Sequence, residues 1–168
     1  LRALGVKHLA MISGDSQVHA ERVAAELGLD EVHAALLPHQ KQERMLEIAK
    51  ERENLVFVGD GMNDAPVLAA SKVGISMGSE ASDAAMESAD VVILTDDLQE
   101  VANLLRISRR TAAIVRQNIV FALLVKALAL SLGALGYASM WIAVLADTGV
   151  TIIAILNALR ILLYRPSR

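Results

Sequence analysis

Two long apolar stretches near the C-terminal end constrain this chain more than any other feature. Residues 119–139 contain a single charged side chain, Lys126, and residues 140–164 contain only Asp147 and Arg160. At about 1.5 Å per residue, a helix of either length spans the roughly 30 Å hydrocarbon core of a bilayer. The sequence therefore predicts a transmembrane helical hairpin. A buried helical pair in a soluble protein is the alternative, and it is disfavoured because a soluble core helix is seldom apolar around its whole circumference.

The distribution of charge divides the chain into an acidic N-terminal part and a basic C-terminal part. Residues 1–105 carry 8 Lys and Arg against 18 Asp and Glu, whereas residues 106–168 carry 8 against 1. Arginines flank the hairpin at both ends, so by the positive-inside rule both ends face the cytoplasm. We expect an integral protein of the cell membrane or inner membrane. Its cytoplasmic parts would be residues 1–118, of which 106–118 form a juxtamembrane helix, and the tail 165–168.

Strand-like and helix-like segments alternate through residues 1–105. Because the strands are apolar throughout, they indicate a parallel sheet covered by helices on both faces. We therefore expect a doubly wound α/β domain, whose ligands bind beyond the carboxyl ends of the strands. The strands are expected at residues 6–13, 31–36, 54–58, 73–77 and 90–94, and the helices at 17–27, 38–53, 64–70 and 80–88, with a last helix that continues from residue 98 into the membrane.

Polar loops with carboxylates follow two of the expected strands. Ser13-Gly14-Asp15 follows the first, and the GDGMNDAP motif at residues 59–66 follows the third. Asp60 and Asp64 in that motif offer the hard oxygens that hold Mg²⁺, an ion that shares its coordination shell with phosphate. A turn with a helix N-cap is the alternative interpretation. The Ser13 hydroxyl can donate to a phosphoryl oxygen and Lys41 can neutralise phosphoryl charge, although such residues are often merely solvated.

In their order and spacing these motifs resemble the second half of the phosphorylation domain of the P-type ATPases, a branch of the haloacid-dehalogenase-like superfamily. The resemblance rests on the Ser13-Gly14-Asp15 loop, Pro38 with Lys41, GDGMNDAP at 59–66 and VGISMG at 73–78. A hairpin over residues 119–164 follows where the family has its last core helices. The resemblance covers essentially the whole chain and implies a haloacid-dehalogenase-like fold followed by a transmembrane hairpin.

The resemblance also implies a reaction in which ATP phosphorylates an Asp, and the aspartyl-phosphate is hydrolysed as the transporter changes state. Such a site works mostly by positioning and electrostatics. Asp60 would bind Mg²⁺, with Asp64 supporting it. The other matched residues are Ser13 and Asn63, which would contact the phosphoryl group, Lys41, which would balance its charge, and Asp15, which with Gly14 would hold the loop near the nucleotide.

The nucleophile itself is not in this sequence. The family's phosphorylated Asp lies in an Asp-Lys-Thr-Gly motif, and no such tetrapeptide occurs between Leu1 and Arg168. The chain also begins without an initiator Met, so we expect a piece of a longer protein that does not turn over ATP alone. Its expected partners are the missing N-terminal portion of the same transporter, which includes the nucleotide-binding domain, and the lipid bilayer and metal ions; no nucleic acid is expected.

Charged side chains inside the hairpin are unfavourable, because inserting one Lys or Asp at the centre of a transmembrane helix costs about 2.5–3.5 kcal/mol of free energy. Lys126 and Asp147 each lie about eight residues into their stretch. We expect their depths in an antiparallel hairpin to differ by several residues, a gap that a long Lys side chain can bridge. A salt bridge that merely locks the hairpin is one interpretation, and a functional site is the other.

The sequence around Asp147 refines the resemblance. Asp147-Thr148-Gly149 and Asn157-Ala158-Leu159-Arg160 resemble the final helix of zinc, cadmium and lead exporters. The Met-Ser-Ser signature of copper exporters and the His-Glu-Gly-Gly signature of cobalt-type members are not found in the sequence. The resemblance implies that Asp147 is an oxygen ligand of the transported cation and that Lys126 is its internal counter-ion. One carboxylate suits Zn²⁺, Cd²⁺ and Pb²⁺ alike.

Two other functions fit parts of the sequence. A haloacid-dehalogenase-like phosphatase tethered by the hairpin would use an upstream Asp-x-Asp nucleophile instead of Asp-Lys-Thr-Gly. A non-catalytic membrane remnant with a binding or regulatory role would begin at a start codon next to Leu1.

Overall fold

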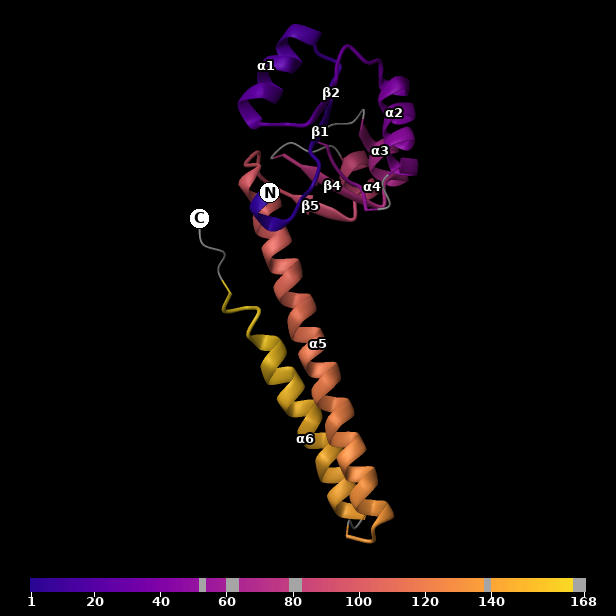
Figure 1. Cartoon of the computed structure of the whole chain (residues 1–168), viewed down its shortest axis with the longest axis vertical. Coiled ribbons are helices and arrows are strands. Elements are labelled where there is room, and N and C mark those ends of the chain that lie inside the picture. The colour runs from indigo at the N-terminus through magenta and orange to yellow at the C-terminus, as the bar shows by residue number, and fades with distance from the viewer. Residues whose placement is uncertain (52–53, 60–63, 79–82, 138–139, 165–168) are drawn as a thin grey trace. The chain divides into compact units, whose positions relative to one another are not determined.

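The computed structural model describes residues 1–51, 54–59, 64–78, 83–137 and 140–164. The chain forms two compact units, Leu1–Val101 and Ala102–Arg168 (Figure 1). Strands alternate with helices in the first unit, and two long helices make up most of the second. The acidic and the basic halves of the sequence thus fold into different kinds of structure.

The strands of the first unit pair only in parallel, as the apolar strand pattern predicts. They form two sheets instead of the single sheet expected from the sequence: β1 pairs with β2, and β4 lies between β3 and β5. The register places Ala10 opposite Glu31 in the smaller sheet and Val56 opposite Val73 in the larger one. The strand bounds are β1 Ala10–Ile12, β2 Glu31–His33, β3 Val56–Gly59, β4 Val73–Met77 and β5 Val91–Ile93.

The helices of this unit agree well with the periodicity of the sequence. Gly28, in a left-handed conformation at φ 65°, ends α1 where the sequence predicts. Figure 1 shows α2, α3 and α4 together on one side of the unit and α1 beside β2. The helices are η1 Arg2–Leu4, α1 Gln17–Leu27, α2 Pro38–Glu51, α3 Ala65–Ala70 and α4 Asp83–Ser88.

Two strands are shorter than the sequence indicates. Residues 6–13 and 31–36 were expected to be extended, yet only Ala10–Ile12 and Glu31–His33 form ladders. A ladder needs a neighbour at every residue, and β2 turns away after His33, since Ala35 adopts a positive φ of 55°. The apolar pattern of a strand predicts that its residues are buried, but it does not predict where the neighbouring strand ends.

The core of the first unit lies between β4 and the helices that cover it. Met45 of α2, Val67 and Leu68 of α3, and Ile75 of β4 are all at most 3% exposed. Gly74 allows the close approach of α3 to β4, because a Cβ there would lie 2.7 Å from the carbonyl oxygen of Leu68. This packing fixes the start of α3, where the GDGMNDAP motif ends.

The second unit is an antiparallel helical hairpin made of α5, Gln99–Ala134, and α6, Met140–Leu159. The two helices run side by side (Figure 1), and Asn157 Nδ2 donates to Asn118 Oδ1 across them at 2.8 Å. Within the described part of the chain, α5 is long and apolar enough to cross a membrane, and Val144–Leu159 is a shorter apolar helical segment. The helix expected to reach residue 164 ends at Leu159, and turns follow it.

Replacing Gly74 with Ala should lower the free energy of unfolding of the chain by about 1–3 kcal/mol, because the added methyl group meets backbone atoms that cannot move aside. Gly133→Ala is the matched control, since a Cβ at Gly133 meets nothing within 4 Å. Denaturant unfolding in detergent, followed by circular dichroism, measures both. Equal stability of the two variants would contradict the packing described for β4 and α3.

Candidate functional site

The loop after β1 holds its own polar side chains together. Ser13 Oγ donates to Asp15 Oδ2 at 2.9 Å and accepts a hydrogen bond from the Asp15 backbone N–H at 3.1 Å. This is the local turn that Ser and Asp favour where a strand ends. The Ser13 hydroxyl can therefore contact a phosphoryl oxygen only after it releases Asp15.

Backbone hydrogen bonds tie this loop to the loop between β2 and α2. The Ala35 N–H donates to the Asp15 carbonyl oxygen at 2.7 Å, and the Leu36 N–H donates to the Ser13 carbonyl oxygen at 3.2 Å. Gly14 leaves room for this contact, because a Cβ there would lie 3.3 Å from the Leu36 carbonyl oxygen. Since α2 begins at Pro38, directly after this loop, the Ser13 loop sets the position of the helix that carries Lys41.

Lys41 and Asp64 meet although they are 23 positions apart in the sequence. Lys41 Nζ lies 3.5 Å from Asp64 Oδ1, and both side chains are largely buried. Asp64 is the N-cap residue of α3, but its side chain makes no capping hydrogen bond, so the carboxylate is directed to Lys41. Among the described residues no hydrogen bond or ion pair joins Lys41 or Asp64 to Ser13 or Asp15.

The Asp64 carboxylate also fits a role beside a magnesium ion. A Cβ at Gly59 would lie 3.0 Å from Asp64 Oδ2, so the glycine keeps space beside an oxygen of the kind that Mg²⁺ prefers. Asp60 and Asn63, which the sequence places at the same site, lie outside the described residues. The structure therefore describes one of the two expected magnesium-site carboxylates, together with the expected phosphoryl-balancing lysine.

A separate charged network lies on β2 and α2. Glu31 Oε2 and His8 Nε2 are 2.9 Å apart, and Glu31 Oε1 and His33 Nε2 are 2.7 Å apart. Hydrogen bonds from His8 and His33 hold the pKa of Glu31 below its ordinary value. In the parts of the chain that the structure describes, no three His, Cys, Asp or Glu side chains are arranged to hold a metal ion. This network therefore braces β2 against α2, where Arg44 also contacts Glu31 at 3.3 Å.

The hairpin brings Lys126 and Asp147 together, as the sequence predicts. Lys126 Nζ lies 3.5 Å from Asp147 Oδ1. Lys126 precedes the end of α5 by 8 residues and Asp147 follows the start of α6 by 7, so their depths are nearly equal. The expected offset of several residues was wrong, because α5 ends at Ala134, five residues before the predicted end of the first apolar stretch.

Two residues with no role predicted from the sequence, Asn118 and Arg110, also connect the segments of the hairpin. Asn118 accepts a hydrogen bond from Asn157 and donates to the Ala154 carbonyl oxygen at 3.0 Å. Arg110 lies over the ring of Tyr164, 4.7 Å from its centroid. A polar Asn at the border of an apolar stretch is a signal for the first contact, whereas no sequence pattern pairs Arg110 with Tyr164.

The chain is similar to known protein families and to individual proteins of known sequence. Two family models, both described as haloacid dehalogenase-like hydrolase, match residues 1–72 and residues 40–105. The cadmium, zinc and cobalt-transporting ATPase of Bacillus subtilis is 48% identical over 165 residues, which are 96% of this chain and 24% of that protein. The zinc-transporting ATPase of Synechocystis is 48% identical over 163 residues, which are 96% of this chain and 23% of that relative.

A solved structure matches the chain equally broadly. The crystal structure of a zinc-transporting PIB-type ATPase in the E2.Pi state has a TM-score of 0.86 and 40% sequence identity to the chain. The match covers 96% of this chain and 26% of that one. The chain therefore spans about a quarter of the length of the proteins that it resembles.

A double-mutant cycle should show that Lys41 and Asp64 are energetically coupled. Lys41→Met leaves a buried carboxylate without its cation, and Asp64→Asn removes that carboxylate, so we expect a coupling free energy of about 0.5–3 kcal/mol. The matched control is the Arg44–Glu47 pair on the surface of α2, whose 2.7 Å contact should couple by about 0.5 kcal/mol or less. Chemical unfolding of the four proteins in each cycle measures both values. No greater coupling for Lys41 and Asp64 would rule out a buried pair.

Proposed function

The chain belongs to the family of heavy-metal-transporting P-type ATPases, and we propose its function from this relationship. On this premise it forms part of an ATP-driven pump that exports Zn²⁺, Cd²⁺ or Pb²⁺ through an aspartyl-phosphate intermediate. The chain contributes the second half of a phosphorylation domain and the last two transmembrane helices. The rest of the transporter contributes the phosphorylated Asp and the nucleotide-binding domain, so ATP hydrolysis is an activity of the whole transporter.

The observation that carries this proposal is the exposure of the ion pair in the hairpin. The side chains of Lys126 and Asp147 are 65% and 68% exposed within this chain. Charges on a lipid-facing surface are strongly unfavourable, by about 2.5–3.5 kcal/mol each at a helix centre. This face of the hairpin is therefore covered in the whole protein, and earlier helices of the same transporter are the cover that we propose. A cation site between those helices and the hairpin would include Asp147.

In the metal-loaded state, Asp147 would bind the cation through a carboxylate oxygen. When the cation leaves, the ammonium group of Lys126 would neutralise the carboxylate, since the two groups already lie 3.5 Å apart. An internal cation of this kind removes the need for a counter-transported proton. The structural interpretation, in which the pair only locks the hairpin, makes a different prediction about metal release.

In the cytoplasmic unit, the residues of this chain would bind and orient the phosphoryl group. Bound Mg²⁺ would screen phosphate charge, held by Asp60 with Asp64 in support. Lys41, beside Asp64, would balance the remaining negative charge as a point cation. Ser13 would exchange its hydrogen bond to Asp15 for one to a phosphoryl oxygen, and Asn63 would donate a second.

The division of the unit into two parallel sheets supports a strand contributed from elsewhere in the protein. In the described residues β1 pairs only with β2, and β3 pairs only with β4, so each has an edge that carries no ladder. Both strands lead into site loops, the first into Ser13 and the second into the GDGMNDAP motif. A parallel strand inserted between β1 and β3 would place its own carboxyl end, with the nucleophilic Asp, between these loops.

Replacing Asp147 with Asn in the intact transporter should abolish Zn²⁺-stimulated ATP hydrolysis, because a neutral amide is a far weaker ligand than a carboxylate. Phosphate release with and without Zn²⁺ measures the effect. Ser131→Ala is the control, since the Ser131 hydroxyl donates to the Ala127 carbonyl oxygen of its own helix and, among the described residues, to no other group. Undiminished stimulation of the Asp147 variant would refute the ligand role.

Replacing Lys126 with Ala should slow metal release while the transporter is still phosphorylated by ATP, because no internal cation then competes for Asp147. Stopped-flow release of Zn²⁺ and efflux into vesicles measure the rate, and acid-stable phosphoprotein measures the first half of the cycle. Normal efflux, combined with a loss of thermal stability like that of Asp147→Asn, would instead support the structural lock.

A further inference from the structure

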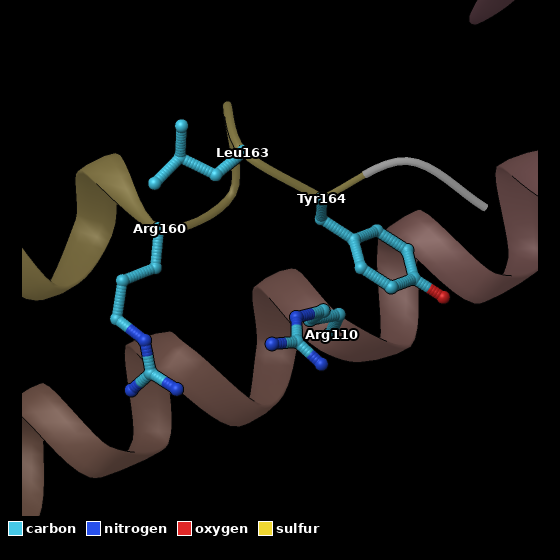
Figure 2. A pocket seen from close by; sticks show the side chains of 4 residues that line it. All are labelled: Arg110, Arg160, Leu163 and Tyr164. Atoms are coloured by element: carbon cyan, nitrogen blue, oxygen red, sulfur yellow. The ribbon is translucent and has the colours of Figure 1, made fainter.

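Two arginines meet at the open end of the hairpin, away from the Lys126–Asp147 pair. Arg110 of α5 and Arg160, just beyond α6, line one pocket with Leu163 and Tyr164, and its volume is about 390 Å³. Figure 2 shows Arg110 rising from α5 between Arg160 and Tyr164. One guanidinium group from α5 and one from the turn after α6 thus border a single space.

Both guanidinium groups are held in place by neighbours that carry no charge. The Arg110 guanidinium lies over the Tyr164 ring, 4.7 Å from its centroid, in cation–π geometry. Arg160 donates one N–H to Asn157 Oδ1 at 2.9 Å. The Tyr164 backbone N–H donates to the Ile161 carbonyl oxygen at 3.1 Å, which closes the turn that returns Tyr164 to α5. These contacts orient the arginines and leave their charge unbalanced.

No acidic side chain of this unit is available to balance that charge. Between residues 102 and 168 the sequence has one acidic residue, Asp147, and it pairs with Lys126 at 3.5 Å. Arginine stays protonated in proteins, so it cannot relieve the repulsion by losing a proton. Two guanidinium groups that are each held by a neighbour and that border one pocket can bind the oxygens of a phosphate group.

The depth of the pocket identifies the source of that phosphate. Arg110 precedes the end of α5 at Ala134 by 24 residues, which is about 36 Å along the helix. The hydrocarbon core is about 30 Å thick, and about 40–45 Å with the headgroup layers. With Ala134 at the far edge of the core, Arg110 lies in the headgroup layer of the cytoplasmic leaflet. Leu162 and Leu163, beside the pocket, are 76% and 84% exposed, as side chains that contact acyl chains would be.

We infer that this pocket binds the headgroup phosphate of an anionic phospholipid from the cytoplasmic leaflet. Arg110 and Arg160 hold the phosphate oxygens, Tyr164 keeps Arg110 in position, and Leu163 packs against the acyl chains. Basic pockets between transmembrane helices on the cytoplasmic side are suited to such headgroups. The inference rests on the membrane insertion of the hairpin in the proposed function, and it does not depend on metal binding by Asp147.

The test measures lipid binding by the full-length transporter that contains this chain. The delipidated protein in detergent is titrated with phosphatidylglycerol or phosphatidylcholine, and bound lipid is counted by native mass spectrometry. We expect tighter binding of phosphatidylglycerol, and we expect the Arg110→Gln, Arg160→Gln double variant to weaken it about thirty-fold, or about fivefold for each arginine. Arg116→Gln removes one charge from the same helix outside the pocket and should bind like the wild type.

A second variant controls for altered membrane insertion of the hairpin, since positively charged arginines also determine the topology of transmembrane helices. Replacing Arg110 and Arg160 with Lys keeps both charges but removes the two forks and the stacking on Tyr164, so phosphatidylglycerol should bind more weakly than to the wild type. Equal binding by this variant, an equal loss in Arg116→Gln, or unchanged binding in the double Gln variant would each overturn the proposed site. Full displacement of the lipid by millimolar inorganic phosphate would also overturn it, in favour of a free-anion site.

The same titration separates this inference from the metal-transport proposal. Asp147→Asn should retain phosphatidylglycerol as the wild type does, because Asp147 precedes Arg160 by 13 residues, which is about 20 Å along the helix. Lipid retention by this variant therefore supports the pocket whatever happens to Zn²⁺-stimulated hydrolysis. Loss of lipid only in the Asp147 variant would contradict the assignment of the site to Arg110 and Arg160.

Discussion

Contacts between the few polar and charged side chains on two apolar helices govern the alignment of the hairpin. Among the described residues, three pairs of side chains join α5 to α6 or to the turn after it: Arg110 with Tyr164, Asn118 with Asn157, and Lys126 with Asp147. Each gives a polar side chain a partner on the other helical segment, and all three agree with one antiparallel register. The apolar side chains between them can slide past one another with little change in energy, so these polar pairs decide how the helices align.

In the first unit, backbone hydrogen bonds set the positions of the candidate site residues. Its site residues come from separated segments of the chain. The backbone N–H groups of Ala35 and Leu36 connect two of these segments by donating to carbonyl oxygens of the Ser13 loop. That connection sets the start of α2, and α2 in turn places Lys41 beside Asp64. Among the described strands, β1 and β3 each have an edge without a ladder partner, which fits the strand that we propose to come from elsewhere in the protein.

Most of the elements could be predicted, because periodicity and terminating residues are local. The bounds of α1 follow from its apolar spacing and Gly28, and those of β4 follow from a run of buried residues. The lengths of β1 and β2 could not be predicted, since they depend on how far a neighbouring strand extends. The end of α6 at Leu159 was also missed, because Ile161, Leu162 and Leu163 are as apolar as the helix before them.

The candidate site also has features that the sequence predicts and features that it does not. The expected chemistry follows from residue types and their order alone, since Ser13, Lys41, Asp64, Lys126 and Asp147 predict hard-oxygen and phosphate binding and a charge pair between apolar helices. The fold shows which side chains lie together: Lys41 with Asp64, and Lys126 with Asp147. Ser13 bonds to Asp15 and, among the described residues, to neither Lys41 nor Asp64. The reason is physical, because composition sets what a side chain can bind, whereas the packing of helices and the pairing of loops set which groups lie within a few ångströms of each other.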